Sequence, residues 1–298
     1  MQQRLSATWF RALLALACCS GFVTVSAATS PLLIEGDFEE GGLANYIVYG
    51  GTPVISTDRA RGGSRSLKSV IDYGAMTGTF DSARTETRPN DPPDGPYIKS
   101  GRTIIGQEYW YGFSIFLPSD FVPSADWEIV TQWHVDPDSV EEKKRNPPMT
   151  ITTTDGRWRM RSSWDDEPIT QKDANGNWIY GGTNRYDLGP YKTGVWTDWV
   201  VHVKWSYKAD GVLEVWKDGV KVISQLNTPN CYNDKIGPYI KFGIYKGWNS
   251  GSSPEPGITK RVLYHDEFRM SGPNGSYDVV APRKEIPQPL PPHSMVVE

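Results

Sequence analysis

Short runs of alternating apolar and polar residues, divided by clusters of Gly, Pro, Asn and Asp, recur along most of the chain. This alternation is typical of half-buried β-strands, because successive side chains of a strand point to opposite faces. Helical periodicity is almost absent, so the chain is expected to be all-β. The clearest strand-like runs are 109–117, 126–135, 157–163, 198–206, 239–245 and 262–270.

The arrangement of these runs predicts one large β domain. Residues 211–223 read as a hairpin, with Lys217-Asp218-Gly219 between two alternating runs. Regularly spaced antiparallel strands favour a sandwich or jelly roll. We expect a β-jelly-roll sandwich of two curved antiparallel sheets over residues 30–272. Residues 136–148 and 165–190 are predicted to be mobile loops at the rim of a sheet.

The N-terminus has the pattern of a secretory signal over residues 1–27. Arg4 and Arg11 precede a short apolar run and then small residues. The apolar run is too short for a comfortable membrane span, and no later segment is long enough. We expect a secreted or periplasmic protein, with a lipid anchor at Cys18 as the weaker alternative.

The remaining composition limits the partners. Only Cys231 lies outside the signal, so no internal disulfide is expected. Without Arg4 and Arg11, 29 basic residues face 35 acidic ones, a net charge of −6. This balance argues against nucleic acid as a partner, and a polyanion would need a local basic cleft. We expect a monomer with a loosely held, proline-rich tail over residues 273–298.

Two strand-like runs gather polar side chains on one face. In the segment RTETR one face carries Arg84, Glu86 and Arg88, and the other carries Thr85 and Thr87. In the run 126–135, alternation places Gln132 and His134 with Glu128 and Val130. The opposite face of that run is predicted to carry Trp127, Ile129, Thr131 and Trp133.

Two further runs repeat this division. The segment YIKFGIY has an apolar face of Ile240, Phe242 and Ile244, and a second face of Tyr239, Lys241, Gly243 and Tyr245. In RWRMR, Trp158 and Met160 lie opposite Arg157, Arg159 and Arg161. Taken singly, such faces are typical of solvated strands with cross-strand ion pairs, and Tyr239 can simply pack at the rim. His202, beside Lys204, is expected to be structural.

Together these groups fit β-elimination from a polymer of uronic acids. Removing the C5 proton of a uronate builds negative charge beside its carboxylate, which Arg84, Gln132 and Lys241 can neutralise. His134 can act as the general base. Tyr245 can be the general acid, or both base and acid. No metal or organic cofactor is needed for this chemistry.

Three motifs, RTETR, QWH and YIKFGIY, resemble the strand motifs of jelly-roll alginate lyases. The stretch from residue 194 to residue 223 is more similar to the related glucuronan and heparin lyases. The resemblance implies that Arg84 and Gln132 neutralise the carboxylate, that His134 is base or neutraliser, that Lys241 supports the charge, and that Tyr245 is the catalytic acid/base. The residues expected to bind substrate are Arg88, Glu86, Arg157, Arg159, Arg161 and Tyr239.

The sequence departs from the alginate lyase pattern at Trp133, where that family has a small aliphatic residue thought to bear on which uronate is accepted. Glucuronan is therefore the favoured substrate, with alginate next. The products would carry 4,5-unsaturated uronate ends.

The resemblance also implies a structural calcium ion. Asp266 is predicted to point inward, because it alternates with Val262, Tyr264 and Phe268, and it then needs either calcium or backbone donors. Asp37 and Glu39 are the candidates for further oxygen ligands.

Two other functions remain open from the sequence. A glycoside hydrolase on the same fold would need two carboxylates flanking the bond, and Glu86 and Glu128 are the candidates. A non-catalytic carbohydrate-binding module would use the aromatic residues as stacking platforms. A structural surface protein is disfavoured by the Gln-x-His and Lys-x-Gly-x-Tyr patterns.

Overall fold

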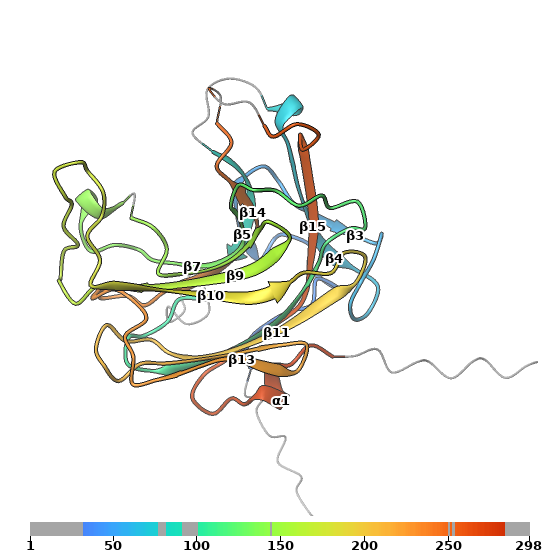
Figure 1. The fold of residues 1–298 in the computed structure, drawn as a ribbon. Coiled ribbons are helices and arrows are strands. Elements are labelled where there is room, and N and C mark those ends of the chain that lie inside the picture. Colours follow the sequence, from blue (N-terminus) through green and yellow to red (C-terminus); the bar gives the residue numbers. More distant parts are fainter. Residues whose placement is uncertain are drawn as a thin grey trace, which may run out of the picture. The chain divides into compact units, whose positions relative to one another are not determined.

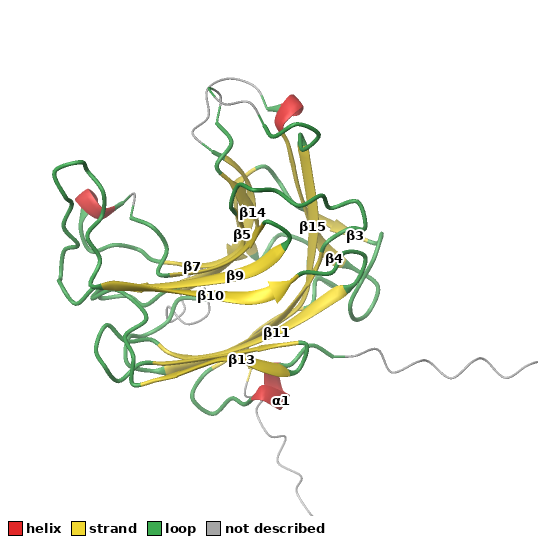
Figure 2. Cartoon of the chain, in the orientation of Figure 1, coloured by secondary structure: helices red, strands yellow, loops and turns green. Residues whose placement is uncertain are grey.

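The computed structural model describes residues 32–76, 82–90, 101–143, 145–249, 251 and 254–283. Within these residues the chain forms two antiparallel sheets of eight and seven strands and very little helix (Figure 1, Figure 2). The predicted all-β jelly-roll class is confirmed. No helix in the described part is both long and apolar enough to cross a membrane. The predicted signal, residues 1–27, lies outside the described residues.

The eight-stranded sheet has the order β13-β12-β11-β6-β15-β4-β3, and β1 also pairs with β15. The predicted hairpin is confirmed as β12 and β13, joined at Asp218-Gly219, where both residues have positive φ. The strands are β1 (Leu32–Gly36), β3 (Val54–Ser56), β4 (Ser66–Asp72), β6 (Glu108–Phe116), β11 (Trp196–Lys204), β12 (Val212–Lys217), β13 (Val220–Leu226) and β15 (Lys260–Ser271).

The seven-stranded sheet has the order β10-β9-β8-β7-β14-β5-β2. Its strands are β2 (Tyr46–Gly50), β5 (Ala83–Pro89), β7 (Glu128–His134), β8 (Met149–Thr154), β9 (Arg157–Trp164), β10 (Gly182–Pro190) and β14 (Tyr239–Lys246). The prediction of a loop over residues 165–190 is wrong at its C-terminal end, where β10 forms. The segment has polar residues such as Asn184 and Asp187, so its sequence lacks the usual strand pattern. This strand lies at the edge of the sheet.

The core lies between the two sheets, which curve together (Figure 1). Apolar side chains from both sheets meet there, among them Trp133, Trp158, Trp199, Phe242 and Leu263. The seven-stranded sheet therefore has one face against the core and one face turned away from it. We call the second face the cleft face.

A β-bulge in β7 changes which of its side chains face the core. Ile129 pairs with Thr152 of β8 and Thr131 pairs with Ile151, so Val130 is an extra residue. Val130 and Trp133 are buried in the core, whereas Trp127 and Ile129 line a cavity on the cleft face. The prediction that Trp127 and Ile129 share the face of Trp133 is therefore wrong, because strict alternation ends at the bulge.

The loop over residues 136–148 is tied to its neighbours through Arg145. The Arg145 guanidinium is buried, with ion pairs of 2.7 Å to Glu142 and 2.6 Å to Asp234. It also donates a hydrogen bond to Thr170, in the segment that follows β9. One buried cation thus joins three connections at one end of the cleft face.

Part of the predicted C-terminal tail packs on the eight-stranded sheet. Helix α1 (Tyr277–Val280) lies over β6, where Gly112 leaves room for it: a Cβ on Gly112 would lie 1.7 Å from the Val280 carbonyl oxygen. Beyond the helix, Arg283 forms a 2.7 Å ion pair with Glu35. Residues 284–298 lie outside the described residues.

Candidate active site

Three neighbouring strands bring the five predicted catalytic residues together on the cleft face. Across β14 and β5, Tyr245 pairs with Arg84. Across β14 and β7, Lys241 pairs with Gln132, and Tyr239 pairs with His134. Because Ile240, Phe242 and Ile244 are buried in the core, the alternate side chains of β14 point to the cleft face.

Gly243 lets the two strands beside β14 interact across it. Gln132 of β7 donates a hydrogen bond from Nε2 to Oε1 of Glu86 on β5, and Gly243 is the register partner of Glu86. Gly243 has φ of +137°, and a Cβ there would lie 2.1 Å from the Thr85 carbonyl oxygen. The glycine in the YIKFGIY motif therefore permits both the close approach of β5 and the Gln132–Glu86 bond.

Lys241 and Glu86 are both buried in the floor of the cleft face. Burial lowers the pKa of Lys241, although the nearby Glu86 charge opposes this shift. Burial likewise raises the pKa of Glu86, against the effects of Lys241, Gln132 and Arg84. Nζ of Lys241 also lies 3.9 Å from the centre of the Tyr49 ring on β2.

His134 is held in its neutral form. Burial, followed by the charge of Lys241, lowers its pKa to about 4. Its Nδ1 lies 2.8 Å from the carbonyl oxygen of Val135 and 3.5 Å from the Tyr239 hydroxyl. A neutral imidazole can accept a proton at pH 7, which is what a general base requires.

Tyr245 lies beside a cation and an exposed indole. The Arg84 guanidinium carbon is 4.3 Å from the centre of the Tyr245 ring, and the Trp127 ring makes an edge contact with centroids 5.3 Å apart. Tyr245 thus lies at the boundary between the buried Lys241 end of the site and the cavity that Trp127 lines.

Two of the predicted substrate-binding residues, Arg88 and Tyr239, lie at the Lys241 end. Nε of Arg88 donates to the Tyr49 hydroxyl at 2.9 Å, and its guanidinium carbon lies 5.0 Å from the Tyr239 ring centre. Arg102 lies 5.4 Å from the same ring. Sequence reasoning missed Tyr49 and Arg102, because neither lies in a motif and only the folded chain brings them here.

The cavity on the other side of Tyr245 has a volume of about 600 Å³. Of the predicted arginine row, Arg159 and Arg161 line it. Arg157 pairs instead with Asp187 at 2.8 Å. Arg185 of β10 also lines the cavity, and it was missed because its segment was predicted to be a loop. Trp133 lies in the core and does not reach this face.

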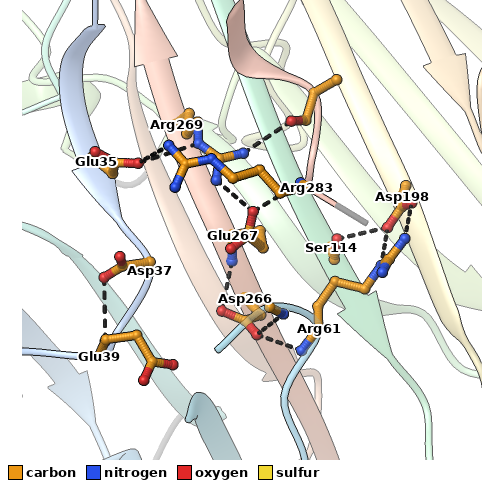
Figure 3. Close-up of polar contacts among 12 residues, drawn as sticks. Glu35, Asp37, Glu39, Arg61, Ser114, Asp198, Asp266, Glu267, Arg269 and Arg283 are labelled. Carbon is orange, nitrogen blue, oxygen red and sulfur yellow. Dashed lines mark hydrogen bonds and ion pairs between the residues drawn. The ribbon is translucent and has the colours of Figure 1, made fainter. Parts of the chain in front are cut away.

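The three residues expected to hold calcium accept hydrogen bonds from neighbouring groups, and Figure 3 shows those of Asp266 and Asp37. Asp266 accepts from the backbone N–H groups of Arg61, Gly62 and Glu267. Glu39 accepts from Ser64 and Arg65, and Asp37 accepts from Glu39. Burial raises the pKa of Asp266 to about 7, although these donors oppose the shift.

These contacts do not fit a calcium ion, which needs oxygen lone pairs turned toward a common centre. Within the described ranges no group of three or more His, Cys, Asp or Glu side chains is arranged to hold a metal. Of the two partners expected for Asp266, the backbone donors are the ones present. The expectation that Asp266 shares a face with Phe268 is wrong, because a bulge at Glu267 (φ 56°) lies between them.

The two carboxylates that a hydrolase would need lie on opposite faces of the sheet. Glu86 is on the cleft face, where Gln132 reaches it. Glu128 lies beneath the sheet and pairs with Lys246 at 3.3 Å and with Arg261 at 2.5 Å. Glu86 and Glu128 therefore cannot flank one glycosidic bond. The cleft face instead offers a neutral imidazole, a phenol and buried cations, which suit proton abstraction beside a carboxylate.

Comparison with known proteins gives one family and several similar folds. The family model described as polysaccharide lyase matches residues 35–269. No curated protein sequence matches the chain.

Among solved structures, the endo-β-1,4-glucuronan lyase from the fungus Trichoderma reesei is similar with a TM-score of 0.68 and 19% identity, over 85% of this chain and 100% of that chain. An alginate lyase of polysaccharide lyase family 7 has a TM-score of 0.46 and 17% identity, over 74% of this chain and 84% of that chain. A GH131 β-glucanase catalytic domain from Podospora anserina has a TM-score of 0.49 and 14% sequence identity. The match covers 82% of this chain and 96% of that chain. At 19% identity, the similarity to the glucuronan lyase is a similarity of fold.

Proposed function

The chain belongs to the polysaccharide lyase family, and we propose that it cleaves a 4-linked uronic-acid polysaccharide by β-elimination. The observation that carries the proposal is the single face that holds Arg84, Gln132, His134, Lys241 and Tyr245 on three adjacent strands. A buried cation and a neutral histidine lie side by side on this face. The cation would bind the carboxylate of an acidic sugar, and the histidine would serve as the general base.

The substrate carboxylate would lie against Arg84, Gln132 and Lys241. These groups would stabilise the negative charge that develops as the C5–H bond breaks. Gln132 uses one amide hydrogen for Glu86, so its second amide hydrogen remains for the substrate.

The proton would pass from C5 to His134 or to the Tyr245 phenolate. The electron pair of the broken C5–H bond forms the C4–C5 double bond while the C4–O4 bond breaks. Tyr245 then supplies a proton to the departing O4. The products are a new non-reducing end with a 4,5-unsaturated uronate and a shortened chain with a hydroxyl at its end, so no water is consumed.

Glucuronan is the first substrate to test, and alginate is the second. The match to the glucuronan lyase has a TM-score of 0.68 and covers the whole of that chain. This similarity of fold supports a cleft of the same general form. A carbohydrate-binding module remains the alternative, because aromatic and cationic side chains can hold an acidic sugar without cleaving it.

The test is ultraviolet absorbance of the unsaturated uronate in mixtures of the purified protein with glucuronan, alginate, heparin or pectate. We expect absorbance to rise with glucuronan, or with alginate, and not to rise with the Tyr245→Phe variant. Polymer binding without any rise in absorbance would overturn the lyase chemistry and favour the binding module.

A further inference from the structure

Trp127 presents an indole to the cleft beside the tyrosine that acts in the proposed reaction. The bulge in β7 turns it to the cleft face, where its side chain is 44% exposed. Its ring contacts Tyr245 at a centroid distance of 5.3 Å and an interplanar angle of 81°. A Cβ on Gly247 would lie 3.1 Å from the indole, so the ring also lies close to the backbone there.

The cavity next to Trp127 has mixed chemistry. Apolar surface comes from Trp127 and Ile129, hydroxyl groups come from Thr150 and Thr152, and cations come from Arg159 and Arg185. Its volume of about 600 Å³ is within the usual range for ligand sites. A sugar acid has the same mixture, because its ring has an apolar C–H face, hydroxyl groups and one carboxylate.

We propose that Trp127 is a sugar-stacking residue, which packs on the C–H face of the pyranose adjacent to the one that reacts at Tyr245. The carboxylate of the stacked sugar is turned to Arg159 or Arg185. This inference rests on the proposed function and extends it, because it assigns a second sugar subsite, in the cavity that lies next to Tyr245 over β8, β9 and β10. An indole supplies a large rigid contact area at little cost in conformational entropy.

Stacking and mere packing give different kinetic results. A residue that binds the neighbouring sugar stabilises the ground state and the transition state alike, so its loss raises KM and leaves kcat almost unchanged. A residue that only supports Tyr245 would lower kcat, because it would displace the acid/base group. The contact with Tyr245 makes this distinction necessary.

The experiment compares Trp127→Ala and Trp127→Phe with Trp216→Ala, the last of which alters a tryptophan on β12 in the other sheet. On the polymer that the wild type cleaves, we expect Trp127→Ala to raise KM about tenfold and to change kcat less than about threefold. Trp127→Phe should recover most of the affinity, and Trp216→Ala should resemble the wild type.

Binding is measured separately in the Tyr245→Phe background, by calorimetry and tryptophan fluorescence with saturated uronate oligosaccharides. We expect these sugars to perturb the fluorescence, and the signal to be lost in Tyr245→Phe/Trp127→Ala but kept in Tyr245→Phe/Trp216→Ala. Equal affinity in the two double variants, or a fall in kcat alone, would overturn the stacking role. If no polymer is cleaved but binding depends on Trp127, the elimination chemistry fails and the stacking role stands.

Discussion

His134 lies on the cleft face, and His202 lies on the outer face of the eight-stranded sheet. The two histidines have similar strand patterns around them in the sequence, but their neighbours in the structure carry opposite charges. Both lie on the polar side of a strand. The ring nitrogens of His202 are 3.0 Å from Glu214 and 3.2 Å from Glu108, and its ring stacks on Trp110. His134 is half-buried, and the charges of Lys241 and Arg84 act on it.

This difference shows that neighbouring strands decide what a histidine can do. Burial and the charge of Lys241 favour the neutral form of His134, whereas two carboxylates lie within hydrogen-bond distance of the His202 ring. Apart from Glu214 on the next strand, these neighbours lie far from the two histidines in the chain, so the local sequence does not reveal them. The predicted structural role of His202 agrees with its stacked and paired position.

The largest contrast between the two faces is expected from a pair of Tyr→Phe variants. Tyr245→Phe removes the proposed acid/base group and should lower kcat by about 10²- to 10⁴-fold. Tyr277→Phe, on α1, should leave kcat within about twofold. Initial rates of unsaturated uronate formation measure both. A Tyr245→Phe enzyme with more than a tenth of wild-type kcat would assign the proton transfers to another group.

A pair of Lys→Met variants tests the role of the cations. Lys241→Met should lower kcat/KM by about 10²-fold, because one group that neutralises the substrate carboxylate is lost. Lys221 is paired with Glu214 at 2.5 Å on the outer face, and Lys221→Met should change kcat/KM less than about twofold. Thermal unfolding of both variants shows whether the fold is intact. Equal losses in the two variants would contradict a specific role for Lys241.

The pH dependence of kcat/KM tests the state of His134. With a pKa of about 4, His134 stays neutral as the pH falls from 7 to 5. The value of kcat/KM should therefore fall to half of its maximum only near pH 4. An ordinary histidine would give this midpoint near pH 6.5. In Lys241→Met the residual activity should fall off at a higher pH, because the Lys241 charge lowers the His134 pKa. A wild-type midpoint near 6.5 would mean that His134 is more hydrated than the structure indicates.

The smallest effect is expected at His202. His202→Gln keeps a hydrogen-bonding side chain between Glu108 and Glu214, so activity should change less than about twofold. The free energy of unfolding should fall by no more than about 1 kcal/mol, since the pairs are partly exposed. Denaturant titration and the absorbance assay measure the two quantities. A large loss of activity would show that the outer face communicates with the cleft.

Alternation predicted the faces of β5 and β14 correctly, because these two strands pair in regular register along the site. It failed in β7 and β15, where one extra residue at Val130 and one at Glu267 reverse the faces. No residue type announced either bulge, since neither position is a glycine. Tyr49 and Arg185 could not be assigned to the site, because that required the order of the strands in the sheet.

The bulge at Val130 also has a consequence for sequence alignment and for protein engineering. If a relative lacks this extra residue, an alignment without a gap would match the cleft-facing Trp127 with the position of the buried Glu128, while the Gln-x-His pair still matched. Comparisons of substrate preference within the family therefore need gaps placed from strand pairing. For the same reason, deleting Val130 would be expected to remove the bulge and to leave both halves of β7 facing as they do now, because Ile129 would then lie two residues from Gln132 on the cleft face.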